Sequence, residues 1–212
     1  VYHSDSGLLC RFPVEVPTLL ELGQVKDLAE WPKHRQKIES GMATILGGFP
    51  KDTPDLQIKI IDELSFPGYI RQRVNYFVDE WERVTAWQFL PEDLEDCPAI
   101  LCLHNRHPSG KDESAGIHGD PHLAFAQRLA EMGYATFAPD CVTAGERVLS
   151  SRVPFDSSTW YDEHPRGALL GKMLHDHMRA LDAMQECRRI DGERLGVVGH
   201  GLGGANALLL AA

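Results

Sequence analysis

A tight turn near the end of the chain, GHGLG at residues 199–203, has the composition and spacing of a chemical site. It follows an apolar run at residues 195–199 and leads into the helix-forming run LGGANALLLAA. A strand that turns sharply into a helix holds the central residue above the strand ends, where helix amides favour negative charge. A serine there would be the nucleophile of a G-x-S-x-G elbow, but the residue is Gly201.

The glycines on either side of the central position have a physical explanation. The turn is so sharp that a side chain at Gly199 or Gly203 would strike the neighbouring strand and helix. His200 precedes the central position, and we expect its side chain to point away from the pocket's centre, for packing or support. A phosphate or dinucleotide loop is the alternative; we disfavour it because the turn follows a late strand and has no terminal G-K-[ST].

A loop rich in histidine and acidic residues follows the apolar run at residues 99–103. Its polar candidates are His104, His107, Asp112, Glu113, His118, Asp120 and His122. Their spacings match no known ligand pattern, so we expect a solvated loop at residues 104–122 and no metal. Ligands of open α/β sheets bind beyond the carboxyl ends of the strands, and we therefore expect this loop to shape a substrate pocket.

Two further residues with possible chemistry, Asp140 and Cys141, follow the apolar run at residues 134–138. Cys141 could replace the missing nucleophile, because it too lies at the carboxyl end of a strand. Nothing in the sequence pairs it with a base, so we expect an ordinary loop thiol beside the pocket. We expect Asp140 to fix the loop through hydrogen bonds to backbone groups.

The elements that must position these residues follow from hydrophobic patterning. Short, almost continuous apolar runs at residues 99–103, 134–138 and 195–199 alternate with helical segments. Continuous apolar strands indicate burial on both faces, and alternation with helices indicates parallel crossovers. The predicted fold class is therefore α/β, with a doubly wound, mostly parallel sheet.

Two amphipathic segments are expected to form the crossover helices. The first spans residues 121–132, stops at Gly133, and has an apolar side made of Leu123, Phe125, Ala126, Leu129 and Met132. The second spans residues 165–187 and has an apolar stripe made of Leu170, Leu174, Met178, Leu181 and Met184. His175 and His177 lie two apart in this second helix, so they point to different faces and are not expected to share a metal ion.

Upstream of residue 91 the pattern predicts a different organisation. A helix is expected over residues 25–46, interrupted near Trp31-Pro32. Two strand-like runs at residues 69–78 and 83–90, joined by a short acidic link, predict an antiparallel hairpin at the edge of the sheet.

Four segments that follow one another in order carry a resemblance to a known family. They are AILCLHNRHPSGKDESAG, LAEMGYATFAPDCVTAGER, FDSSTWYDEHPRGALLGKMLHDHMRALDAM and RLGVVGHGLGG. From about residue 66 to the end, the chain resembles the dienelactone-hydrolase and acetyl-xylan-esterase-like branch of the α/β-hydrolase superfamily. The resemblance implies the N-terminal part of an α/β-hydrolase domain at residues 66–212, preceded by a helical N-terminal extension at residues 1–65. The apolar end of the chain predicts further strands beyond Ala212.

The resemblance also implies a serine carboxylester hydrolase that acts on a small-molecule ester and uses no metal or organic cofactor. The backbone amide of Leu202 would be one oxyanion-hole donor, and a second would come from the loop around Asn105 and Arg106. The turn at residues 145–147 resembles a structural feature of the family that holds a loop near the pocket. In the family's chain order the acid and the histidine follow the nucleophile, so both are expected beyond Ala212.

Gly201 departs from the family pattern, because glycine has no side chain to attack a carbonyl. Loss of a triad serine costs roughly a million-fold in turnover. The chain as written is therefore expected to be close to inert. Three functions stay open. The first is an esterase lineage in which Gly201 is an engineered change, an error or a natural loss. The second is a non-catalytic relative that keeps the pocket for binding or as a scaffold, and the third is a structural or interaction module that has retained only the fold.

Charge and composition argue against several other classes of function. The 212 residues carry a formal net charge of -10, and a nucleic-acid partner is not expected because its binding needs clustered Lys and Arg. No membrane partner is expected either, because no apolar run approaches roughly 20 residues. No signal peptide is visible, and five scattered cysteines without a C-x-x-C pair favour free thiols, so a cytoplasmic location is favoured. The oligomeric state is not determined.

Overall fold

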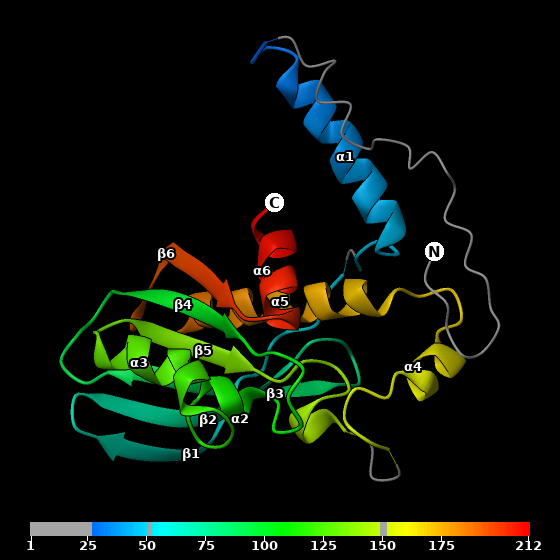
Figure 1. The fold of residues 1–212 in the computed structure, drawn as a ribbon. Helices are drawn as coiled ribbons and strands as arrows, with labels where there is room; N and C mark the ends of the chain where they lie inside the picture. Colours follow the sequence, from blue (N-terminus) through cyan, green and yellow to red (C-terminus); the bar gives the residue numbers. More distant parts are fainter. Residues whose placement is uncertain (1–26, 51, 149–151) are drawn as a thin grey trace. The chain divides into compact units, whose positions relative to one another are not determined.

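A computed structural model describes residues 27–50, 52–148 and 152–212 (Figure 1). The described residues divide into two units at the boundary between Ile45 and Leu46. The described part of the first unit holds α1 (Trp31–Ile45). Pro32 lies in the first turn of this helix, where its missing N–H has no helical partner to lose. The interruption expected near Trp31-Pro32 is therefore the start of the helix, and residues 25–26 lie outside the described ranges.

The second unit is built on one six-stranded sheet with the order β1-β2-β3-β5-β4-β6. The strands are β1 (Lys59–Phe66), β2 (Tyr69–Phe77), β3 (Arg83–Pro91), β4 (Cys97–Leu103), β5 (Ala135–Pro139) and β6 (Ile190–Gly199). β1, β2, β3 and β5 pair antiparallel in succession, whereas β5, β4 and β6 pair parallel. The sheet is mixed, and its parallel part carries the alternation with helices that the sequence predicts.

The predicted hairpin forms β2 and β3, in a register that places Val74 opposite Ala86. Its expected place at the edge of the sheet is wrong, because β1 pairs with the outer side of β2. β1 was missed in the sequence because nearly all its side chains are exposed and give no buried alternation. Backbone pairing with β2 is what holds this strand in the sheet.

The parallel strands are doubly wound, as predicted. The β4–β5 connection contains α2 (Lys111–Ser114) and α3 (Phe125–Glu131), and the β5–β6 connection contains α4 (Ser158–Glu163) and α5 (Leu169–Glu186). β5 and β6 lie on opposite sides of β4, so right-handed crossovers place α3 and α5 on opposite faces of the sheet (Figure 1). Each helix closes a separate apolar core, through Ala126 on one face and Met184 on the other.

The two predicted crossover helices differ from the structure in detail. The first is split into a 3-10 turn at Pro121–Leu123 and α3, and Met132 is exposed because the helix has already ended before Gly133, whose φ is +93°. In the second, Met178 is exposed, whereas Ala180 and Ala183 face the core. Small residues at the sheet contact let α5 approach closely, which a count of large apolar residues does not register.

β6 leads into α6 (Leu202–Ala211), which packs on the same side of the sheet as α5. The expected burial of residues 195–199 on both faces is wrong, since they are exposed or only half-buried. In the described part of the chain no strand pairs with the outer side of β6. No helix in that part combines the length and apolar character that crossing a membrane requires.

Candidate active site

The turn between β6 and α6 has the geometry of a strained elbow. Gly201 sits between the strand and the first residue of α6 with φ 54° and ψ -115°. This left-handed conformation is one that side-chain-bearing residues adopt only under strain. A G-x-S-x-G elbow holds its serine on this kind of sharp strand-to-helix turn. The backbone therefore has the conformation that holds a nucleophile at position 201, but Gly201 supplies no functional group.

Close backbone packing explains the neighbouring glycines. A Cβ on Gly199 would overlap the backbone of Gly203, well inside the 3.0 Å below which real Cβ contacts essentially never occur. A Cβ on Gly203 would overlap the carbonyl of Leu103, at the end of β4. β4 and α6 thus approach each other at a distance that only glycine allows.

Asn105, in the loop after β4, lies directly over the elbow. Its Oδ1 accepts a hydrogen bond from the Leu202 N–H at 3.2 Å. A Cβ built on Gly201 would overlap Oδ1 and Cγ of the same carboxamide. The loop around Asn105 was expected to supply a donor, whereas the Asn105 side chain acts as an acceptor for the other expected donor, Leu202.

Arg106, in the loop after β4, contacts Phe155, which lies between β5 and α4. Arg106 is exposed, and its guanidinium carbon lies 5.3 Å from the centre of the Phe155 ring. Phe155 has φ 64°, and its N–H donates to the Thr143 carbonyl at 2.8 Å. Thr143 also has positive φ, at 63°. Two non-glycine residues are thus held in a strained conformation in the loop that faces this site.

His104 is a structural residue rather than a base. It is buried, and its Nδ1 donates to the Asn105 carbonyl at 2.7 Å while its Nε2 accepts from the Cys141 N–H at 3.0 Å. Both ring nitrogens are therefore used in one neutral tautomer. Burial lowers the pKa of His104, which favours the same neutral form. The ring links the loops that follow β4 and β5.

Two more of the histidines singled out in the sequence, His107 and His200, do not link the loops as His104 does. His200 is exposed and therefore does not pack, and its supporting role stays a prediction. His107 is half-buried, accepts from the Ser109 N–H at 3.3 Å, and has its Nε2 3.9 Å from Glu113. These contacts tie His107 to its own loop rather than to the elbow.

Cys141 has the properties of a buried loop thiol, as the sequence suggested. It is 3% exposed, and burial raises the pKa of its thiol to about 12. A thiol in this environment stays protonated at neutral pH, whereas the thiolate is the attacking form. Cys141 therefore does not replace the missing nucleophile.

Asp140 holds three loop segments together. Its carboxylate accepts from the Lys111 N–H at 2.9 Å and the Glu146 N–H at 3.1 Å, and Lys111 Nζ lies 2.6 Å from it. A Cβ on Gly110 or Gly145 would overlap this carboxylate. The two glycines allow the backbone to approach the buried charge, so Asp140 fixes the loops by hydrogen bonds to backbone.

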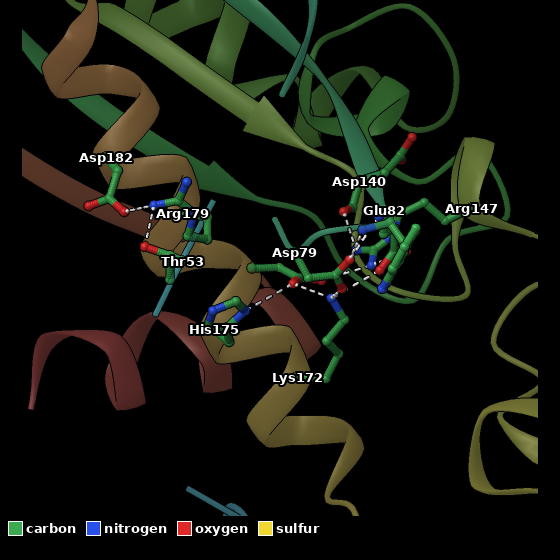
Figure 2. A network of polar contacts seen from close by, with 11 residues as sticks. Thr53, Asp79, Glu82, Asp140, Arg147, Lys172, His175, Arg179 and Asp182 are labelled. Atoms are coloured by element: carbon green, nitrogen blue, oxygen red, sulfur yellow. Dashed lines mark hydrogen bonds and ion pairs between the residues drawn. The ribbon is translucent and has the colours of Figure 1, made fainter. Parts of the chain in front are cut away.

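A network of paired charges is buried at Arg147 and Asp176 and partly exposed at Asp79 and Glu82 (Figure 2). Arg147 contacts Glu82 at 2.6 Å and Asp176 at 2.8 Å, and Lys172 contacts Asp176 at 2.8 Å, Glu82 at 2.9 Å and Asp79 at 3.1 Å. These groups come from the β2–β3 turn, the loop after β5 and helix α5. The turn at residues 145–147 therefore ties the loop to α5, which is the structural role that the sequence suggested.

The charges of this network stabilise one another's ionised forms. Burial by itself would raise the pKa of Asp176, but Arg147, His175 and Lys172 hold it well below its usual range. Burial would lower the pKa of Arg147, but Asp176 and Glu82 raise it above its usual value. Asp176 and Arg147 are thus ionised and paired at neutral pH.

Farther along α5, Arg179 makes a second set of polar contacts (Figure 2). It donates to Asp182 at 2.7 Å, to the Thr53 hydroxyl at 3.3 Å and to the Pro54 carbonyl at 2.6 Å. These bonds fasten the segment before β1 to the helix.

A cavity of about 330 Å³ opens beside the network. The loop after β5, α4 and α5 line it, with Trp160 as its largest aromatic wall residue. Val142 and Trp160 of this wall belong to the same apolar cluster as Leu202. The sequence predicted a pocket shaped by residues 104–122 and missed this wall. The aromatic pair Trp160-Tyr161, which lies in α4 of the connection after β5, was the available signal.

Metal and disulfide chemistry find no support in the described residues. No group of three or more His, Cys, Asp and Glu side chains there lies close enough to hold a metal ion. The four described cysteines, Cys97, Cys102, Cys141 and Cys187, are free thiols.

Gly199, Gly201 and Gly204 have the spacing G-x-G-x-x-G, which is that of a dinucleotide-binding loop. In that motif the amides that open the helix face a pyrophosphate, and the turn follows the first strand of a βαβ unit. Here the turn follows β6, and Asn105 occupies the first amide of α6. The spacing is present, but its structural setting is that of an elbow.

Comparisons with known proteins identify relatives of this chain. YtaP, a Bacillus subtilis protein named as a hydrolase, is 30% identical over 139 residues, which cover 62% of this chain and 44% of that protein. A Bacteroides fragilis protein named as an acetyl xylan esterase shares the fold, with a TM-score of 0.75, 24% identity, and coverage of 86% of this chain and 50% of that chain.

A glucuronoyl esterase from Solibacter usitatus also shares the fold, with a TM-score of 0.61, 15% identity, and coverage of 93% of this chain and 60% of that chain. The chain thus spans about half the length of the relatives it matches. The fold is that of the α/β-hydrolases. The model of the dienelactone hydrolase family matches residues 94–212, which is more than half of the sequence. The chain therefore belongs to the dienelactone hydrolase family.

Proposed function

We propose that this chain belongs to a carboxylester hydrolase lineage that acts on small-molecule esters, and that Gly201 leaves it without nucleophilic activity. The observation that carries the proposal is the strained turn at Gly201, placed between a parallel strand and the first amide of a helix. The family membership and the esterase fold of its structural neighbours support it. No metal or organic cofactor is part of the proposal.

In the proposed reaction the ester carbonyl oxygen lies at the Leu202 N–H. This amide opens α6, so the helix dipole adds to its preference for negative charge. A second donor comes from the backbone of the loop at Asn105 and Arg106. Such donors stabilise the oxyanion of a tetrahedral intermediate, which is often the largest single contribution to catalysis. The attack itself needs a hydroxyl that Gly201 does not provide.

Binding without turnover is the second candidate function. It is favoured by one observation, that the Asn105 carboxamide fills the space of the side chain missing at Gly201. A catalytic site would need that space for its nucleophile. A protein that only binds or scaffolds has no such need.

Hydrolysis of p-nitrophenyl acetate by the full-length protein tests the proposal. We expect negligible hydrolysis for the Gly201 form and a rise of about a thousand-fold or more for Gly201→Ser. Gly201→Ala is the matched control, because it adds the same Cβ without the hydroxyl and should stay inactive. Equally negligible rates from well-folded Gly201→Ser and Gly201→Ala variants would contradict the hydrolase lineage and favour the binding role.

A further inference from the structure

We propose that Asn105 is an internal stopper that closes the oxyanion site of the Gly201 chain, and that this site takes a carboxylate or ester carbonyl oxygen when the stopper moves. This inference rests on the proposed role of Leu202 as an oxyanion donor. It goes further by assigning Asn105 a function in gating access to that donor.

The contacts of Asn105 show which part of it is fixed. Its backbone carbonyl accepts from His104 Nδ1 at 2.7 Å and from the His107 N–H at 2.8 Å. His104 is itself held by the Cys141 N–H. The backbone at Asn105 is thus anchored to β4 and to the loop after β5. Only the side-chain torsions are left to change.

The carboxamide of Asn105 makes a single hydrogen bond among the described residues, and the side chain can rotate toward solvent. Its Oδ1 accepts from the Leu202 N–H at 3.2 Å, and the residue is half-buried rather than enclosed. A rotation about the side-chain torsions exchanges this single neutral hydrogen bond for bonds to water. Such an exchange changes the equilibrium constant only about fivefold. The stopper can therefore be displaced by a ligand of modest affinity.

The same position defines the competing ligand. Oδ1 of Asn105 is a carbonyl oxygen on the first amide of a ten-residue helix. A ligand that replaces it must present an oxygen acceptor, and the helix dipole favours an acceptor with negative charge. A carboxylate meets both conditions, as does the oxygen of an ester carbonyl that gains charge during attack.

The absent side chain at Gly201 is what allows the stopper to close. Any Cβ at this position would overlap Oδ1 and Cγ of Asn105. A residue with a side chain at 201 therefore rotates the carboxamide away and frees Leu202. Gly201 and Asn105 form a coupled pair, in which one glycine both removes the nucleophile and lets the oxyanion donor be capped.

A ¹⁵N-labelled sample titrated with sodium acetate, with the Leu202 amide as the probe, tests the gating. We expect a small shift in the natural chain and a saturable shift in Asn105→Ala, at an acetate concentration at least about fivefold lower. Asn105→Asp is the matched control, because it keeps the acceptor and adds a charge that holds the amide more tightly. Equal acetate responses in the natural chain and Asn105→Ala would overturn the inference.

A stability cycle tests the coupling even if one variant folds poorly. In the Gly201 background, Asn105→Ala removes a helix-capping bond and should raise the unfolding equilibrium constant about fivefold. In the Gly201→Ala background that bond is already broken, so Asn105→Ala should change the constant less than about twofold. Equal effects in both backgrounds would refute the coupling. Neither readout needs turnover, so acetate binding without hydrolysis in the Gly201→Ser variant would reject the proposed function alone.

Discussion

The elbow and the buried charge network lie near the same loops but are built in opposite ways. The elbow consists of backbone and three glycines, with one amide aimed at a position where a reacting oxygen could lie. The network holds five charged side chains, Asp79, Glu82, Arg147, Lys172 and Asp176, and each is paired within it.

This difference separates chemistry from architecture. Each charge in the network already has an oppositely charged partner, and the geometry of these pairs is set by folding. The elbow has one orienting amide whose partner, Asn105, makes a single displaceable bond. The paired charges Asp79, Glu82, Arg147 and Lys172 line the cavity, whereas the elbow presents only backbone at its central position.

The largest expected effect comes from adding one methyl group at the elbow. Gly203→Ala places a Cβ against the Leu103 carbonyl, which is backbone and cannot rotate away. We expect a loss of about 5 kcal/mol or more in the free energy of unfolding, measured in urea. Gly196→Ala in the same strand-turn-helix segment is the control, since its Cβ would meet only Ile100 Cγ1 at 3.9 Å. Similar losses for both variants would show that the close approach at Gly203 is not special.

The next largest loss of unfolding free energy is expected for a substitution in the charge network. Asp176→Asn leaves Arg147 and Lys172 with too few carboxylates in a buried setting, and we expect a loss of about 4 kcal/mol. Asp182→Asn is the control on the same helix, because the Asp182 side chain is 48% exposed and its pairing with Arg179 should contribute within about 1 kcal/mol. Equal losses would mean that burial does not distinguish the two pairs.

The effect of Asp176 should also depend on pH. Its pKa is lower in the folded chain than in the unfolded chain, so the unfolded state takes up the proton first as pH falls. The stabilisation is present above the ordinary carboxyl pKa of about 4 and is lost below it. The difference in unfolding free energy between the natural chain and Asp176→Asn should therefore shrink below about pH 4. A difference that stays constant as the pH falls well below this value would contradict this origin.

His177 supplies a smaller effect that appears only in mild acid. Burial lowers its pKa from 6.5 to about 4, so the unfolded state binds the proton first. Its contribution to stability is present above a pH of about 6.5 and falls as pH drops toward about 4, by up to about 3 kcal/mol. His177→Gln cannot titrate, so its unfolding free energy should lack this part of the pH dependence. Parallel pH curves for the two chains would remove His177 as the cause.

The smallest effect is expected at Cys141, which tests whether the site has a hidden nucleophile. Its thiol pKa of about 12 and its burial make it unreactive in the folded chain. Cys141→Ala in the Gly201→Ser background should change p-nitrophenyl acetate hydrolysis less than about twofold. Iodoacetamide should label Cys141 only on unfolding. A large loss of hydrolysis would return Cys141 to the candidate site.

Local patterns in the sequence determined the parallel strands, the doubly wound class and the glycine turn at residues 199–203. These features depend on short-range rules: apolar runs for buried strands, and glycine where a sharp turn meets a neighbouring backbone. They also determined that Gly201 lacks a nucleophile, since that follows from the residue itself.

Only the tertiary structure decided what surrounds the turn. β1 joins the sheet by backbone pairing, and Asn105 reaches Leu202 across 97 positions of sequence. The pairing of Arg147 with Glu82 and Asp176 likewise joins three distant segments. Such contacts leave no periodic signal, because they depend on where the fold brings loop ends together and on which polar groups then lack water. The sequence therefore located the elbow, and the fold decided that its amide is capped.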